Sequence, residues 1–88
     1  MNPPNMLTNF IILTKDVCLL KDRPLEYSLI LADNSLDAKY RVKVVYEGET
    51  CIQTLPTDQE HIAREWYDRI VRGAVTPCTL EYVTEDME

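Results

Sequence analysis

The chain has 88 residues, enough for one domain with a modest core but too few to enclose a deep cleft between subdomains. Its composition, 45% hydrophobic and 27% charged, is typical of a folded protein and excludes a low-complexity chain. The net charge of −6 is uneven: residues 1–43 carry six basic and five acidic side chains, whereas residues 44–88 carry three basic and ten acidic ones. This balance disfavours direct binding to nucleic acid or to an anionic membrane, because both require a cationic surface.

The first 24 residues contain two short apolar runs, at 10–13 and 17–20. Neither approaches the roughly 20 residues that a membrane-spanning helix needs. The start, MNPPNML, lacks the basic region of a signal peptide, which predicts a cytoplasmic location. Segment 7–14 is rich in residues that favour strands, so it is expected to form an extra strand, with a buried coil or a short helix as the alternative.

Residues 25–55 are predicted to form an antiparallel β-meander. Apolar and polar side chains alternate in 25–32 and again in 39–46, which is the period of a half-buried strand. Turn-forming residues between the two segments predict a hairpin with a loop of about six residues. Glu47-Gly48 predicts a tight turn into a third strand at 49–55, with Gly48 at a positive φ.

Residues 57–72 are predicted to form the main helix. Thr57 is the expected N-cap, Glu60 completes a capping box with it, and Gly73 is expected to end the helix in the left-handed conformation. Apolar residues at helical spacing predict the side that packs on the sheet. These residues are Ile62, Trp66 and Ile70, extended by Ala63, Tyr67 and Val71. On the exposed side an i,i+4 ion pair is expected between Glu65 and Arg69.

A second, short helix is predicted over residues 77–86, with Thr76 as N-cap and Pro77 in the first helical position. Leu80, Val83 and Met87 would lie on one side of it. The predicted fold is therefore α+β: an antiparallel three- to four-stranded β-meander with two C-terminal helices packed on one face, forming a single domain over residues 1–88.

Catalytic chemistry has little support in the sequence. His61 could pair with one of three cysteines as nucleophile and base, but no third orienting group accompanies it, and a solvent-facing histidine in a first helical turn is the expected alternative. Cys18, Cys51 and Cys78 form no C-x-x-C pair and are expected to be buried thiols. No catalytic residue, cofactor or metal site is predicted.

The segment YSLILADNSLDAKYRVKVVYEGETCIQT, followed by the predicted main helix and the tail GAVTPCTLEYVTEDME, resembles a family of short proteins of Firmicutes-type bacteria, known only as domain-of-unknown-function family 6514. The resemblance covers roughly residues 25–88 and implies a hairpin followed by two helices, without implying an activity or a cofactor. Cys78 and Tyr82 depart from the family pattern. The matching positions are Tyr40, Thr76, Pro77, Leu80, Val83, Glu85 and Asp86.

The acidity of residues 44–88 predicts a non-enzymatic binding protein that docks on a basic surface of a protein partner. In its sharper form the protein would be an inhibitor, encoded by a mobile element, that mimics nucleic acid and blocks a nuclease or a CRISPR or restriction effector. The alternative is a cytoplasmic regulator or homodimer whose charge serves only solubility. Carboxylates paired for metal-assisted or glycoside chemistry are less favoured than a solvated acidic face. The predicted partner-binding residues are Glu60, Glu65, Asp68, Glu81, Glu85 and Asp86.

Overall fold

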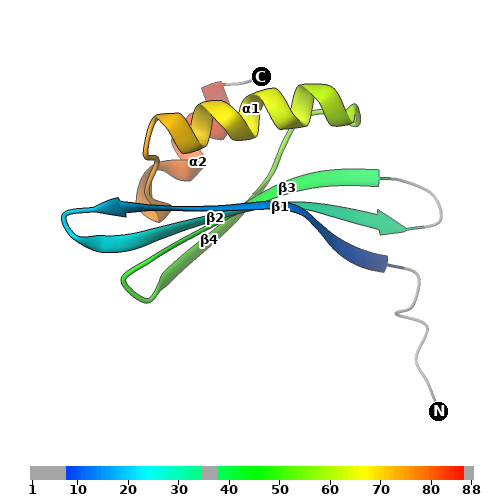
Figure 1. Ribbon diagram of the computed structural model, residues 1–88. Coiled ribbons are helices and arrows are strands. Elements are labelled where there is room, and N and C mark those ends of the chain that lie inside the picture. The colour runs from blue at the N-terminus through cyan, green and yellow to red at the C-terminus, as the bar shows by residue number, and fades with distance from the viewer. Residues whose placement is uncertain (1–7, 35–37, 87–88) are drawn as a thin grey trace, which may run out of the picture.

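A computed structural model of the chain describes residues 8–34 and 38–86 and contains four strands and two helices (Figure 1). The fold is α+β, as predicted. Its strands follow one another in both sequence and space, in the order β1-β2-β3-β4, and every neighbouring pair is antiparallel. The elements are β1 (Thr8–Leu20), β2 (Arg23–Asn34), β3 (Ala38–Tyr46), β4 (Glu49–Thr54), α1 (Glu60–Arg72) and α2 (Pro77–Asp86).

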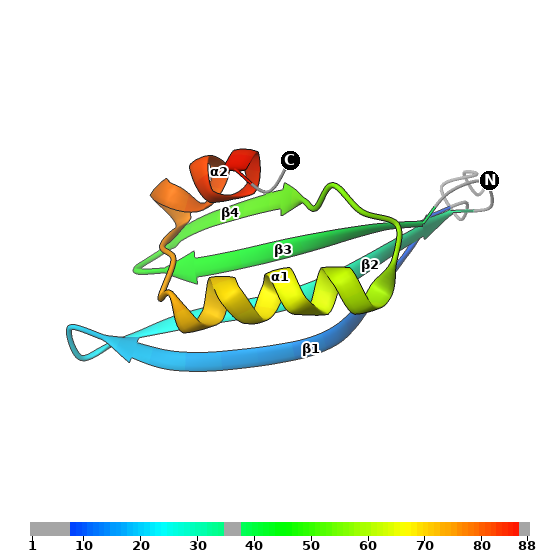
Figure 2. The same cartoon turned by 90° about the horizontal axis from the view of Figure 1, so that it is seen from above.

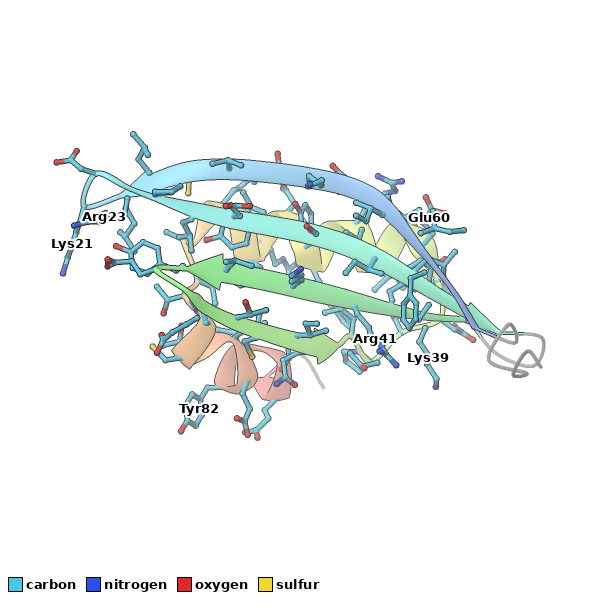
Figure 3. The ribbon with its side chains drawn as sticks, turned by 90° about the horizontal axis from the view of Figure 1, so that it is seen from below. Lys21, Arg23, Lys39, Arg41, Glu60 and Tyr82 are labelled. Carbon is cyan, nitrogen blue, oxygen red and sulfur yellow. The ribbon has the colours of Figure 1, made fainter. Side chains whose placement is uncertain are left out.

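Both helices lie on the same face of the sheet (Figures 1 and 2). Viewed from above, α1 runs along the sheet over β2 and β3, while α2 lies beside it and contacts β4 and β3 (Figure 2). The opposite face carries no helix (Figure 3). We call the two sides of the sheet the covered face and the open face.

The core lies between the covered face and the helices. Alternate residues of β2 and β3 point toward the helices, because successive side chains of a strand point to opposite sides. Full burial of a leucine contributes about 2 kcal/mol to folding. The buried cluster consists of Leu25, Tyr27, Leu29, Tyr40, Val42, Val44, Leu55, Ala63, Tyr67, Ile70 and Leu80.

β1 is a complete strand of 13 residues that includes both apolar runs of the N-terminal segment. A two-residue turn, Lys21-Asp22, connects it to β2, and both turn residues have positive φ values of 53° and 65°. These values are typical of a type I′ hairpin turn, whose twist matches that of the strands. The β3–β4 turn is similar: Glu47 and Gly48 have φ values of 50° and 83°, as predicted for Gly48.

The β2–β3 hairpin is tighter than expected. β2 continues to Asn34 and β3 begins at Ala38, so the loop is shorter than the predicted six residues. Residues 35–37 lie outside the described residues.

A β-bulge interrupts β1 between Ile12 and Thr14, where Leu13 is the extra residue opposite β2. One extra residue reverses the side to which the following side chains point. Phe10 and Ile12 before the bulge therefore share the open face with Val17 and Leu19 after it.

α1 ends at Arg72 as predicted, but its start and both of its caps differ from the prediction. The helix begins at Glu60, three residues later than predicted, because Thr57 Oγ1 accepts a hydrogen bond from the N–H of Gln59 at 3.1 Å in a local turn and caps no helix. At the other end Gly73 has a φ of −83°, and Ala74 adopts the left-handed conformation with a φ of 51°. Ala74 N–H donates to Val71 O and Val75 N–H donates to Ile70 O, so a Schellman motif forms without a glycine at its left-handed position.

α2 begins as predicted, with Thr76 before Pro77. Thr79 Oγ1 accepts a hydrogen bond from Thr76 N–H at 3.3 Å, which is the return bond of a capping box. The buried side differs from the prediction because Thr84 is buried beside Leu80 and satisfies its hydroxyl on Leu80 O at 3.2 Å. Met87 lies outside the described residues.

Candidate binding surfaces

The open face of the sheet is not the polar surface that an antiparallel sheet normally turns toward water. Five of the large exposed apolar side chains point to it from the strands. Four of them are on β1: Phe10, Ile12, Val17 and Leu19 expose 63%, 55%, 63% and 71% of their surface. Cross-strand rows define the open face as Phe10–Ala32–Lys39, Ile12–Ile30–Arg41–Thr54, Lys15–Ser28–Lys43–Ile52, Val17–Glu26–Val45–Thr50 and Leu19–Pro24.

The open face is also basic, although the chain as a whole is acidic. Its rows contain four basic side chains and a single acidic one, Glu26. Lys39 and Arg41 lie near the start of β3, and the guanidinium carbon of Arg41 is 5.8 Å from the centre of the Phe10 ring (Figure 3). Among the described residues, no carboxylate forms an ion pair with Lys15, Arg41 or Lys43.

Arg41 is the most constrained of these cations. Its Nε is buried and has no hydrogen-bond partner within the described parts of the chain. The guanidinium lies over the Phe10 ring at the distance of a cation–π interaction, which restricts its position. Ala32, opposite Phe10 in the same row, is buried. The face therefore presents a positioned arginine beside an apolar stripe.

The predicted binding residues of α1 are exposed but largely neutralised by their own helix. Arg64 donates to Glu60 at 2.8 Å, and Arg72 contacts Asp68 at 2.7 Å, each at i,i+4 spacing. The expected pair of Glu65 with Arg69 is not formed among the described residues, and both side chains are exposed. The outer side of α1 therefore carries no strong excess of negative charge.

The predicted binding residues of α2 lie apart from those of α1, beyond β4 (Figure 2). Glu81 and Glu85 are exposed, and α2 contains no basic residue. The side chain of Asp86 lies outside the described residues. Tyr82 exposes 66% of its surface and points away from the sheet (Figure 3).

The structure brings no catalytic pair together from His61 and the cysteines. His61 is exposed in the first turn of α1. The prediction of buried thiols is wrong: Cys18 and Cys51 are half-buried and Cys78 is exposed in the first turn of α2. Cys51 and Cys78 line one shallow pocket of about 370 Å³ with Glu49, Thr50 and Pro77.

Tyrosine hydroxyls connect the elements of the covered face. Tyr27 donates to Val75 O at 3.0 Å, Tyr46 to Leu20 O at 2.8 Å and Tyr67 to Asp16 Oδ2 at 2.7 Å. Burial, with a smaller contribution from Cys18, raises the pKa of Tyr27 to about 12. Burial and then the bond to Asp16 raise the pKa of Tyr67 as well. These tyrosines are neutral hydrogen-bond donors that hold the fold together.

No group of three or more histidine, cysteine, aspartate or glutamate side chains is placed to hold a metal ion in the described parts of the chain. Neither α1 nor α2 is long and apolar enough to cross a membrane. No protein-family model, curated protein or solved structure matches the chain. The resemblance to the bacterial family therefore stays a prediction.

Sequence reasoning missed the open face, although two signals for it were present. Arg41 and Lys43 alternate with buried residues of β3, so the period of a strand places both on the side opposite the core. Phe10 to Leu13 form a continuous apolar run, which in a strand supplies both faces. No pattern indicated the bulge at Leu13, which places the exposed apolar residues of both halves of β1 on the open face.

Proposed function

We propose that the protein is a small binding protein, not an enzyme, and that the open face is its main docking surface for another macromolecule. The exposure of Phe10, Val17 and Leu19 carries this proposal. Large contiguous apolar patches are rare on monomeric proteins and mark interaction sites when polar residues surround them. Here the apolar residues lie along β1 from Phe10 to Leu19, interrupted by Lys15, and adjoin the cations of β3.

Affinity capture with matched variants tests the proposal. Wild-type protein, a Val17→Ser/Leu19→Ser variant and a Tyr82→Ser variant are immobilised and incubated with lysate of the source cells. Tyr82 is the matched control because it is as exposed as Val17 and Leu19 but lies on α2. We expect a protein that is retained by the wild type and by Tyr82→Ser and lost from the double variant. Identical sets on all three would contradict the assignment of the open face.

We further propose the acidic C-terminal half as a second docking surface, for a protein partner with a basic surface. Two observations favour α2 over α1: Glu81 and Glu85 are exposed with no ion pair among the described residues, whereas Glu60 and Asp68 are paired with arginines. Inhibition of a nuclease or of a CRISPR or restriction effector by nucleic-acid mimicry stays a prediction that rests on this surface.

Charge reversal separates the second surface from the first. Glu81→Lys/Glu85→Lys should weaken capture of a basic partner by more than about tenfold at low salt, because exposed charges act through long-range attraction that salt screens. Glu65→Lys is the control on α1. If both changes weaken capture equally, or if neither does, the acidity would serve only solubility, and the protein would be a regulator or a homodimer. A cytoplasmic location also stays a prediction.

A further inference from the structure

We infer that the occupant of the open face is an acidic amphipathic helix of a partner protein, lying along β2 with its apolar side on β1 and its carboxylates toward β3. This inference rests on the proposed function and deepens it by naming the partner's chemistry. It follows from the separation of the two kinds of side chain across the sheet.

Most of the exposed apolar side chains and most of the basic ones lie on different strands, although one of the four cations, Lys15, is on β1. β1 contributes four exposed apolar residues, whereas β3 contributes Lys39, Arg41 and Lys43. Strands are about 4.8 Å apart, so β1 and β3 are separated by about 10 Å. That distance equals the width of an α-helix with its side chains, about 10–12 Å. A helix above β2 therefore contacts both strands at once.

The length of the face sets the length of the helix. The open-face residues of β1 extend from Phe10 to Leu19, which at about 3.3 Å per residue is roughly 30 Å of strand. A helix rises about 1.5 Å per residue, so about 20 residues span the face. Such a helix needs apolar residues at i, i+3, i+4 and i+7 and acids on the flank facing β3.

Charge argues against a second copy of the chain as occupant. Two open faces stacked on each other would bring together eight basic and two acidic side chains, twice the four and one of each copy. Like charges placed together in an interface cost several kcal/mol. The chain's own helices are also unsuitable, because the apolar sides of α1 and α2 are already used in the core through Ile70 and Leu80.

The arrangement of the cations argues against an anionic membrane and against nucleic acid. Arg41 and Lys43 are half-buried on an inner strand, each with one isoleucine beside it (Ile30 and Ile52), instead of at a rim where lipid headgroups would lie. Nucleic-acid platforms stack bases on several aromatic rings. Phe10 is the single aromatic residue in the rows, and Arg41 already lies over it.

A helical peptide library tests the inference. Each peptide has about 20 residues, a fixed leucine stripe, and flanking positions that are either Glu or Lys. Selection on the wild-type protein should enrich Glu along one flank. A selected peptide should then bind at least about tenfold more weakly to Arg41→Glu and to Lys43→Glu. Lys43 is a second cation of β3 with no ion pair among the described residues, so its variant keeps the test open if Arg41→Glu does not fold. Arg69→Glu, an exposed cation of α1, should bind as the wild type does.

The possible results separate the inference from the proposed function. Enriched peptides without a preference for Glu, lost on Val17→Ser/Leu19→Ser, would keep the open face as a docking surface and overturn the acidic partner. If selection enriches no peptide on the wild type relative to the double variant, both the inference and the proposed function are overturned. If the protein dimerises and Leu19→Ser abolishes the dimer, the open face belongs to a second copy. If the protein binds phosphatidylserine vesicles and Arg41→Glu abolishes this binding, the open face belongs to a membrane. Either result overturns the inference.

Discussion

On the covered face, Leu25 and Leu29 of β2 are fully buried beneath the helices, whereas on the open face Leu19 of the neighbouring strand exposes 71% of its surface. The same residue type therefore has two roles in one sheet. The covered leucines lose their contact with water when the chain folds, so they stabilise the fold. The open-face leucine stays in contact with water in the folded chain, so its apolar surface can stabilise only a complex.

The comparison is tested most directly by removing a leucine from each face. Leu29→Ala should lower the free energy of unfolding by about 3–4 kcal/mol, because it leaves a cavity in a closely packed site. Leu19→Ala should change it by less than about 0.5 kcal/mol, as at other exposed positions. Urea denaturation followed by circular dichroism measures both. Similar losses at the two positions would mean that the open face is covered in the isolated protein.

Alkaline pH should weaken the covered face through Tyr27. The pKa of Tyr27 is about 12 in the folded protein and about 10 in an unfolded chain, so the folded state holds this proton more tightly. The stability that this pKa difference contributes, about 2–3 kcal/mol, is fully present below pH 10 and is lost as the pH rises from about 10 to about 12. Tyr27→Phe should flatten this part of the pH dependence of urea denaturation, whereas Tyr82→Phe, on an exposed residue, should preserve it.

The bond between Tyr67 and Asp16 joins α1 to β1 and thus attaches the edge strand to the covering layer. A double-mutant cycle of Tyr67→Phe and Asp16→Asn should give a coupling of about 1.5 kcal/mol, the lower end for a hydrogen bond to a charged group, because Asp16 is exposed. Additive effects of the two changes in thermal or urea denaturation would show that the bond adds no stability.

The smallest expected effect is a gain. Ala74 holds a left-handed conformation that costs a residue with a Cβ about 1 kcal/mol. Ala74→Gly should therefore raise the free energy of unfolding by up to about 1 kcal/mol, and Gly73→Ala should not produce the same gain because its φ is −83°. Peptide binding at the open face should stay unchanged in both variants, since the change lies in the covering layer.

The sequence sufficed for the covered side of the molecule and failed for the open side, for a physical reason. Alternation in β2 and β3 and helical spacing in α1 are local patterns, and they predicted the meander and the helices correctly. The expected N-cap at Thr57 and the left-handed conformation expected at Gly73 were wrong, because Thr57 and Ala74 form local hydrogen bonds that compete with the expected ones. The bulge at Leu13 depends on how β1 pairs with β2, which no local pattern determines.

The prediction of the binding site was also limited by the use of local sequence patterns. The acids of residues 44–88 could be counted, but the ion pairs of Glu60 and Asp68 depend on which rotamers α1 presents. Net charge by half of the chain also concealed the basic face, because its cations come from β1 and β3 while the acids come mainly from later residues. Charge summed along the sequence does not give charge summed over a surface.

The bulge in β1 also affects how the chain behaves at high concentration. β1 is an edge strand, and a long apolar edge strand is a template onto which strands of other molecules can add, leading to fibrils. The bulge breaks the regular ladder at Leu13, and the charged residues Lys15 and Asp16 follow it at once. Strand addition is thereby discouraged along the edge while the apolar stripe of the face stays intact. The apolar open face can thus stay exposed for the partner that we propose, while the edge of the sheet is a poor template for polymerisation.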